Sequence, residues 1–134
     1  MKLIVCLDNN RGMLFYNRRQ SSDKIVCQKI QELCQGNKLW MNAYSGYLFA
    51  DKSSNIHIDA DFLLRAGEDD YCFVENVDIS PYLSSVKKVI IFHWNRDYPA
   101  DLYFPELKPG FALISREEFS GNSHEKITME VFSR

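Results

Sequence analysis

The sequence contains little proline and little glycine. Only 4 prolines and 6 glycines occur among its 134 residues, and 46% of the residues are hydrophobic. Disordered and low-complexity chains are rich in proline, glycine and polar residues, so this composition argues against them. A folded chain of this length buries roughly two-thirds of the surface that it exposes when unfolded, enough for one hydrophobic core but not for two. We therefore expect one domain that spans residues 1–134.

A strong net charge and a long hydrophobic run are also missing. The formal charge is -2, so no overall field attracts nucleic acid or an anionic membrane. No apolar run approaches the roughly 20 residues that cross a bilayer. Asp8 follows the first apolar run too closely for a secretory signal peptide. We expect a cytoplasmic protein without membrane partners, and nucleic acid is not favoured as a partner.

Motifs typical of metal sites are absent from the sequence. The four cysteines form no C-x-x-C pair and lie in apolar stretches, which favours reduced thiols in the core over disulfides or ligands. The histidines form neither an H-x-H nor an H-E-x-x-H pattern. We expect no metal site. The residues concerned are Cys6, Cys27, Cys34, Cys72, His57, His93 and His124.

The hydrophobic pattern of the first half of the chain alternates between strands and helices. The run Lys2–Leu7 is rich in branched apolar residues, which is typical of a central strand covered on both faces. Apolar residues at helical spacing after Ser21-Ser22-Asp23 predict a capped amphipathic helix at Asp23–Cys34. Further strands are expected at Lys38–Tyr44, Ile56–Ile58 and Tyr71–Val74, short helices at Ser45–Phe49 and Asp59–Ala66 (capped by Asp59), and a loop at Asp51–Asn55.

The second half continues this alternation and then changes to strands alone. Ser80–Leu83 predicts a helical turn with proline at its start, and Lys87–Trp94 predicts a buried strand. Ala112–Ser115 and Thr128–Phe132 predict a closing antiparallel pair. The fold class expected is therefore α/β: a single-domain three-layer sandwich with a mixed, mainly parallel sheet and a C-terminal antiparallel hairpin.

Several short strings stand in a suggestive order along the chain. They are Leu3–Asn10 followed by Asn17, Ser22–Lys24 before a helix, Lys38–Met41, Lys87–Phe92, Ala100–Pro105, Phe111–Ser115 and Glu130–Arg134. They resemble, in this order, parts of the dihydrofolate reductase family: its first strand and active-site loop, its carboxylate-bearing helix, its second and penultimate strands, its Gly-Asp-Thr-x-Phe-Pro turn and its closing hairpin. The resemblance covers most of the chain and implies a shortened, divergent dihydrofolate-reductase-like domain.

The chain departs from the family where the family binds NADPH. Asn42-Ala43 stands where the family has Gly-Arg, so a side chain replaces bare backbone and a cation is lost. Glu75-Asn76 stands in place of a Gly-Gly turn, and an acid there repels phosphate. The segment between Tyr47 and Gly67 is also too short for the family's adenosine-binding strand and loops. Part of the nucleotide-binding region is therefore expected to be missing, and no cofactor is expected.

The resemblance also suggests residues for a substrate site. Asp23 falls where the family has the carboxylate that hydrogen-bonds a pterin and assists its protonation, a role that needs a raised pKa. The local pattern alone equally predicts that Asp23 is a helix cap. Asn17 falls in the closing loop, and His93 near the position that steadies the pterin. Trp40 and Phe92 are candidates to line a planar ligand, although aromatic side chains on strands are usually core.

One basic cluster gives a separate hypothesis. Arg11, Arg18 and Arg19 lie close together in the sequence, ahead of a predicted helix, and could bind phosphate or an RNA backbone. A solvated loop balanced by nearby acids explains the same residues without a ligand.

These observations lead to one principal functional hypothesis and two alternatives. The first is a non-catalytic module that binds a small molecule or a protein and has a degraded NADPH site. The second is an NADPH-dependent reductase of a pterin or related heterocycle, in which Asp23 assists protonation. The third is a phosphate- or RNA-binding protein that uses the segment Arg11–Arg19. The sequence leaves open whether the protein is an enzyme; if it is, the reductase is the type expected.

Overall fold

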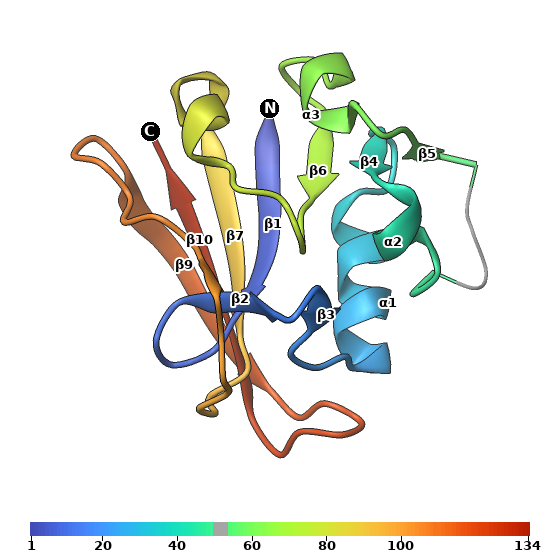
Figure 1. Cartoon of the computed structure of the whole chain (residues 1–134). Helices are drawn as coiled ribbons and strands as arrows, with labels where there is room; N and C mark the ends of the chain where they lie inside the picture. The colour runs from blue at the N-terminus through green and yellow to red at the C-terminus, as the bar shows by residue number, and fades with distance from the viewer. Residues whose placement is uncertain (50–53) are drawn as a thin grey trace.

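The structure is a computed structural model that describes residues 1–49 and 54–134. Its main element is a seven-stranded sheet with the strand order β5-β4-β6-β1-β7-β10-β9 (Figure 1). The pairs from β5 to β7 are parallel, and β10 is antiparallel to both β7 and β9. The strands are β1 (Lys2–Leu7), β4 (Leu39–Met41), β5 (Ile56–Ile58), β6 (Tyr71–Phe73), β7 (Lys88–His93), β9 (Ala112–Phe119) and β10 (Ile127–Ser133). The predicted mixed, mainly parallel sheet with a C-terminal hairpin is confirmed.

The strand β1 lies at the centre of this sheet. Its residues pair with Lys88–His93 of β7 on one side and with β6 on the other. Leu3 and Val5 point into one hydrophobic cluster, while Ile4 points into the cluster on the opposite face. A strand covered on both faces needs apolar residues in succession, which explains the unbroken apolar run at the start of the chain.

One face of the sheet is covered by α1 (Lys24–Leu33). Val26 and Ile30 of this helix are buried against Ile4 and Phe92 of the sheet. Spacing of three to four residues places apolar side chains on one side of a helix, so the periodicity identified the buried face. The helix predicted at Asp23–Cys34 is confirmed, with those two residues as its caps.

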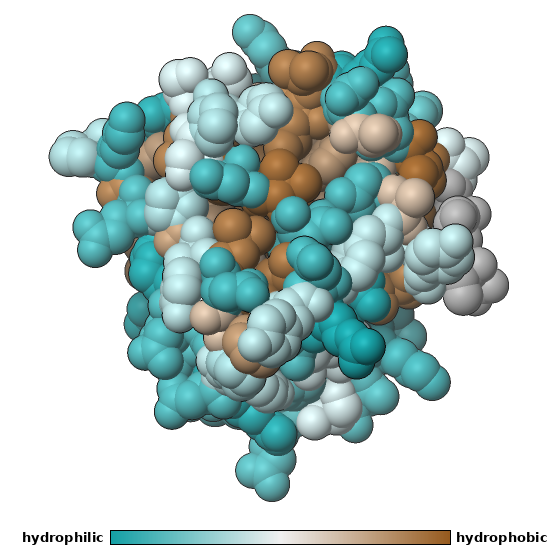
Figure 2. Space-filling model, in the orientation of Figure 1, coloured by the Kyte–Doolittle hydropathy of each residue, from teal (hydrophilic) through white to brown (hydrophobic). Residues whose placement is uncertain are grey.

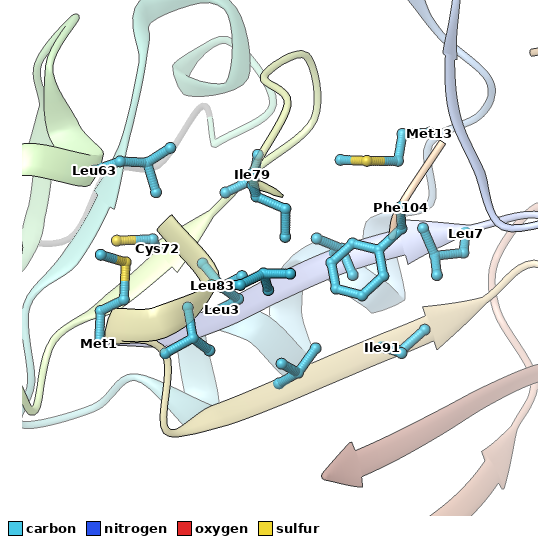
Figure 3. Close-up of a cluster of buried hydrophobic side chains, with 14 of the residues drawn as sticks. Met1, Leu3, Leu7, Met13, Leu63, Cys72, Ile79, Leu83, Ile91 and Phe104 are labelled. Atoms are coloured by element: carbon cyan, nitrogen blue, oxygen red, sulfur yellow. The ribbon is translucent and has the colours of Figure 1, made fainter. Parts of the chain in front are cut away.

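The other face is covered by short elements. They are α3 (Phe62–Arg65), the 3-10 helix η1 (Ser80–Ser85) and a small antiparallel sheet of β2 (Gly12–Phe15), β3 (Arg18–Arg19) and β8 (Leu102–Tyr103). Figure 3 shows Leu3 and Leu7 of β1 in one hydrophobic cluster with Met13 of β2, Ile79 just before η1 and Phe104 just after β8. The three layers predicted from the sequence are thus present, but the small sheet was not anticipated because strands of two to four residues carry too little alternation.

Two helix boundaries differ from the sequence prediction. The helix α2 (Ala43–Gly46) begins before Ser45, because the Asn42 side chain accepts a hydrogen bond from the Ser45 N–H and caps it. This cap also ends the preceding strand earlier than predicted. The helix α3 is shorter than predicted, with Asp61 rather than Asp59 at its N-cap, because Asp59 Oδ1 accepts the Asp61 N–H and holds a turn before the helix.

Two further predictions concern loops. The loop after the predicted strand Ala112–Ser115 begins later than expected, because β9 continues to Phe119, paired with β10 along its length. The loop predicted at Asp51–Asn55 lies mostly outside the described residues.

The surface in the view of Figure 2 is largely hydrophilic, with hydrophobic patches between. In the part of the chain that the structure describes, no helix is long and apolar enough to span a membrane.

Candidate functional site

Polar side chains gather at the edge of the sheet where β1, β6 and β7 end. The N-terminus of α1 lies at this edge, as does the turn between β9 and β10, because β10 runs antiparallel to β7 and pairs Thr128 with His93. Ligands of open α/β sheets bind outside the carboxyl ends of the parallel strands. This edge is therefore where a functional site is expected.

Asp23 joins α1 to the turn between β9 and β10. Its Oδ1 accepts hydrogen bonds from the Ile25 N–H at 2.9 Å and the Asn122 N–H at 3.0 Å. Its Oδ2 lies 2.9 Å from the Ser123 nitrogen, 3.1 Å from Ser123 Oγ and 3.0 Å from His124 Nδ1. The carboxylate is fully buried, and its contact with Ile25 confirms that Asp23 caps the helix.

These hydrogen bonds determine the charge on Asp23. Burial favours the neutral acid, but hydrogen bonds from the Ser123 N–H, His124 and the Asn122 and Ile25 N–H groups outweigh it and hold the pKa well below its usual range. The raised pKa that the resemblance implied is absent. Its physical reason is that this carboxylate is buried among donors rather than among apolar groups.

His124 is the residue that sequence reasoning missed. Its ring is buried and stacks on Trp94, with 4.6 Å between the ring centres. Its Nδ1 faces Asp23, while its Nε2 lies 3.0 Å from Ser21 Oγ and 3.4 Å from the Tyr98 hydroxyl. No sequence motif joins His124 to Ser21, because 103 positions separate them and only the pairing of β7 with β10 brings them together.

An open groove lies beside Asp23, between α1, the segment after α2 and the turn that holds Asn122. We call it the α1 groove. Its volume is about 660 Å³, and it is lined by Ser22, Asp23, Lys24, Cys27, Gln28, Gln31, Tyr47, Leu48, Phe49, Asn122 and Ser123. A cavity of about 10 Å³ lies on the inner side of Ser21, and an open pocket of about 510 Å³ lies between the β2–β3 hairpin and Tyr98.

Side chains bridge the ends of β4 and β6. Glu75 is buried, and its carboxylate accepts hydrogen bonds from Ser45 Oγ at 2.8 Å and from the Arg19 guanidinium at 2.9 and 3.1 Å. Asn42 Nδ2 donates to Asn76 Oδ1 at 2.8 Å. Asn42 and Asn76 thus bond to each other across this edge, and Glu75 bonds to Ser45 and Arg19.

The structure does not bring Trp40 and Phe92 together. Phe92 faces α1, packs in the core and makes an edge contact with Phe119. Trp40 packs against the cluster on the opposite face of the sheet, stacks on His57 and donates its ring N–H to Asp70. Two rings on opposite faces of a sheet cannot line the same planar ligand.

His93 and Asn17 also lie apart from Asp23. His93 follows Phe92 in the strand, so its side chain points to the face opposite α1. There its Nε2 lies 2.5 Å from Glu130 Oε1, and Arg116 pairs with the other carboxylate oxygen. Asn17 is exposed in the turn between β2 and β3, with a φ of 59° that a hairpin turn of this kind requires.

Two of the three arginines of the basic cluster are engaged within the protein. The Arg11 guanidinium donates to the carbonyl oxygens of Phe104 and Pro105. Arg19 pairs with Glu75, as described above. Arg18 is exposed, and its guanidinium forms no ion pair or hydrogen bond with the described residues.

The cysteines and the other potential metal ligands form no separate cluster in the part of the chain that the structure describes. All four cysteines are free, as predicted, and burial raises the pKa of each thiol. Residues 1–49 and 54–134 contain no group of three His, Cys, Asp or Glu side chains arranged to hold a metal ion.

The sequence matches no family model and no curated protein. Among solved structures, the fold is similar to that of dihydrofolate reductase from Enterococcus faecalis, described as complexed with NADP(H) and RAB-propyl. The TM-score is 0.71, and the alignment covers 99% of this chain and 95% of that chain at 9% sequence identity. The dihydrofolate-reductase-like fold is therefore confirmed. An identity this low carries the fold and not the activity.

Proposed function

We propose that this domain binds a small molecule and does not carry out NADPH-dependent reduction. The observation that carries the proposal is the bridge between the ends of β4 and β6. There Glu75 holds Ser45 and Arg19, and Asn42 holds Asn76. A nucleotide at this edge would have to break these bonds, and its phosphates would meet a buried carboxylate.

The arrangement around Asp23 also argues against a pterin that binds this carboxylate. A carboxylate offers about four lone-pair directions to donors. Five donor groups from Ile25, Asn122, Ser123 and His124 already surround Asp23. A heterocycle that binds this carboxylate would have to displace the turn between β9 and β10.

The α1 groove is the binding site that we propose instead. It combines polar side chains of Lys24 and Gln28 with the apolar surface of Leu48 and Phe49. Ligand sites commonly pair apolar walls with a few polar groups that orient the ligand. The groove therefore suits a small molecule with a flat apolar part and an uncharged or anionic polar end.

The third hypothesis, phosphate or RNA binding, has less support. A binding cluster needs several cations whose charge faces solvent. Arg19 is neutralised by Glu75, and Arg11 donates to backbone carbonyls, which leaves Arg18 as the exposed member of the three.

Thermal unfolding with added ligands tests the proposal, because binding to the folded state raises the melting temperature. We expect no shift with NADPH and a shift with small planar heterocycles, for which folate analogues are the first probes. The shift should vanish in Gln28→Trp, which fills the α1 groove, and persist in the control Arg18→Ala. A shift with NADPH that Asn42→Asp abolishes would contradict the proposal, as would heterocycle binding that Gln28→Trp leaves unchanged.

A further inference from the structure

Ser21, His124 and Asp23 form a continuous line of hydrogen-bonding atoms. Ser21 Oγ lies 3.0 Å from His124 Nε2, and His124 Nδ1 lies 3.0 Å from Asp23 Oδ2. The residues come from the segment before α1, the helix cap and the turn between β9 and β10. A hydroxyl, an imidazole and a carboxylate in this sequence of contacts are the parts of a serine nucleophile, its general base and the group that orients the base.

The contacts also fix which nitrogen of His124 carries the proton. An ionised carboxylate only accepts hydrogen bonds, so the Nδ1 atom beside Asp23 must be the donor. In the neutral imidazole the Nε2 lone pair then faces Ser21 Oγ and can accept the hydroxyl proton. Stacking on Trp94 and the contact of Ser123 Oγ with Nδ1 hold the ring in this orientation.

We propose that Ser21 is an activated nucleophile, with His124 as its general base and Asp23 as a positioning residue, and that it reacts with short-chain carboxylic esters. This acyl-transfer activity goes beyond the binding role proposed above and does not depend on it. Ser21 is partly exposed, while the base behind it is buried, as a nucleophile that meets a substrate from the solvent side requires.

The reaction balances without a cofactor. Ser21 Oγ bonds to the carbonyl carbon of the ester while its proton passes to His124 Nε2. The bond from that carbon to the alcohol oxygen breaks, and the alcohol leaves with the proton from Nε2. Water then attacks the acyl-serine, which releases the carboxylic acid and restores the Ser21 hydroxyl. To the Tyr98 hydroxyl, which lies 3.4 Å from Nε2, we assign the stabilisation of the negative oxygen that forms.

The space around Ser21 sets the class of substrate. The cavity on its inner side, bordered by Cys6, Phe73 and Trp94, measures about 10 Å³, which is close to the size of one water molecule. An acyl group that points inward must therefore be very short. The alcohol part can extend outward, where Ser22 borders the α1 groove and Tyr98 borders the pocket beside the β2–β3 hairpin.

The experiment treats the full chain with a fluorophosphonate, which labels activated serines, and locates the adduct by peptide mass spectrometry. We expect one adduct, on Ser21, and slow release of p-nitrophenol from p-nitrophenyl acetate. Ser21→Ala should abolish both. His124→Gln should lower the labelling rate about 100-fold, the usual contribution of a general base. The matched control is Ser115→Ala, which removes an exposed hydroxyl on β9 and should leave both rates unchanged.

Three results would overturn the proposal: a folded wild-type chain that takes no label, an adduct at Ser22 or another residue, or an esterase rate that Ser21→Ala does not lower. The wild-type measurement decides the question even where a variant fails to fold. Thermal unfolding of each variant identifies such failures. We expect Ser21→Ala to fold, because it removes one hydrogen bond from the cap region. Ser21 is not among the residues that line the α1 groove, and the ligand-binding test uses no Ser21 variant. The two proposals can therefore fail separately.

Discussion

The Arg19 guanidinium contacts the Glu75 carboxylate at two points: Nε lies 2.9 Å from Oε2, and Nη2 lies 3.1 Å from Oε1. Glu75 is buried, whereas about a quarter of the Arg19 side chain is exposed. The pair links β3 of the small sheet to the end of β6 in the large sheet. It therefore fastens the hairpin that carries Arg18 onto the edge where the candidate site lies.

Arg19→Met should destabilise the protein by about 1–3 kcal/mol, because it leaves a buried carboxylate with one donor, Ser45, in place of three bonds. Glu75→Gln in the same chain should recover part of the loss, since a neutral amide needs no cation. Urea unfolding of the two single variants and the double variant measures this coupling. Losses that simply add would show that the pair contributes nothing beyond its separate side chains.

Stability should fall in acid because of Asp23. Its pKa is lower in the folded protein than in the unfolded chain, so the charged form stabilises the fold. That contribution is complete above the unfolded value of about 3.9 and is lost as the pH falls below about 4. Thermal unfolding between pH 7 and pH 2 should show a decline that begins near pH 4 in wild type and is shallower in Asp23→Asn. Parallel curves for the two proteins would contradict the role of Asp23.

The turn between β9 and β10 should not tolerate a side chain at Gly121. A Cβ atom there would lie 2.8 Å from both the Asp23 carboxyl carbon and Ile127 Cδ1, well inside normal contact distance. Gly121→Ala should therefore cost about 1–3 kcal/mol of stability, as overpacking of a rigid site does. Gly67→Ala is the matched control, because its Cβ would meet only the Asp70 side chain at 3.4 Å or beyond. Equal unfolding midpoints for the two variants would show that the turn can move away from Asp23.

The elements and their order could be predicted because they depend on local patterns. Branched apolar residues in Lys2–Leu7 require a strand buried on both faces, and the apolar spacing after Asp23 requires an amphipathic helix. Helix boundaries were less predictable, because more than one residue near the end of a helix can cap it. Asn42 ended β4 and began α2 through a single side-chain contact with the Ser45 N–H.

The site could be predicted only where a residue contacts its neighbours in the sequence. The capping role of Asp23 follows from its sequence context. Its contact with His124 depends on the pairing of β7 with β10, which no local pattern encodes. The placement of Trp40 and Phe92 on opposite faces follows in the same way from the register of the whole sheet.

The four cysteines should be nearly inert toward thiol reagents in the folded protein. Thiolate is the reactive form, and burial raises the pKa of Cys27 to about 11 and that of Cys34 and Cys72 to about 12. Titration with Ellman's reagent at pH 8 should therefore be slow in the native state. All four groups should react quickly in guanidinium chloride, because unfolding restores ordinary pKa values near 8.5.

Burial also sets the order in which the four cysteines react in the native protein. Cys6 and Cys27 are partly exposed, whereas Cys34 and Cys72 are fully buried. Cys27 borders the α1 groove, so a reagent can reach it without opening the core. The fastest native phase should thus disappear in Cys27→Ala and remain in Cys72→Ala. A fast phase that survives Cys27→Ala would mean that the groove is not the route of entry, and that the core around the other thiols opens more readily than their burial implies.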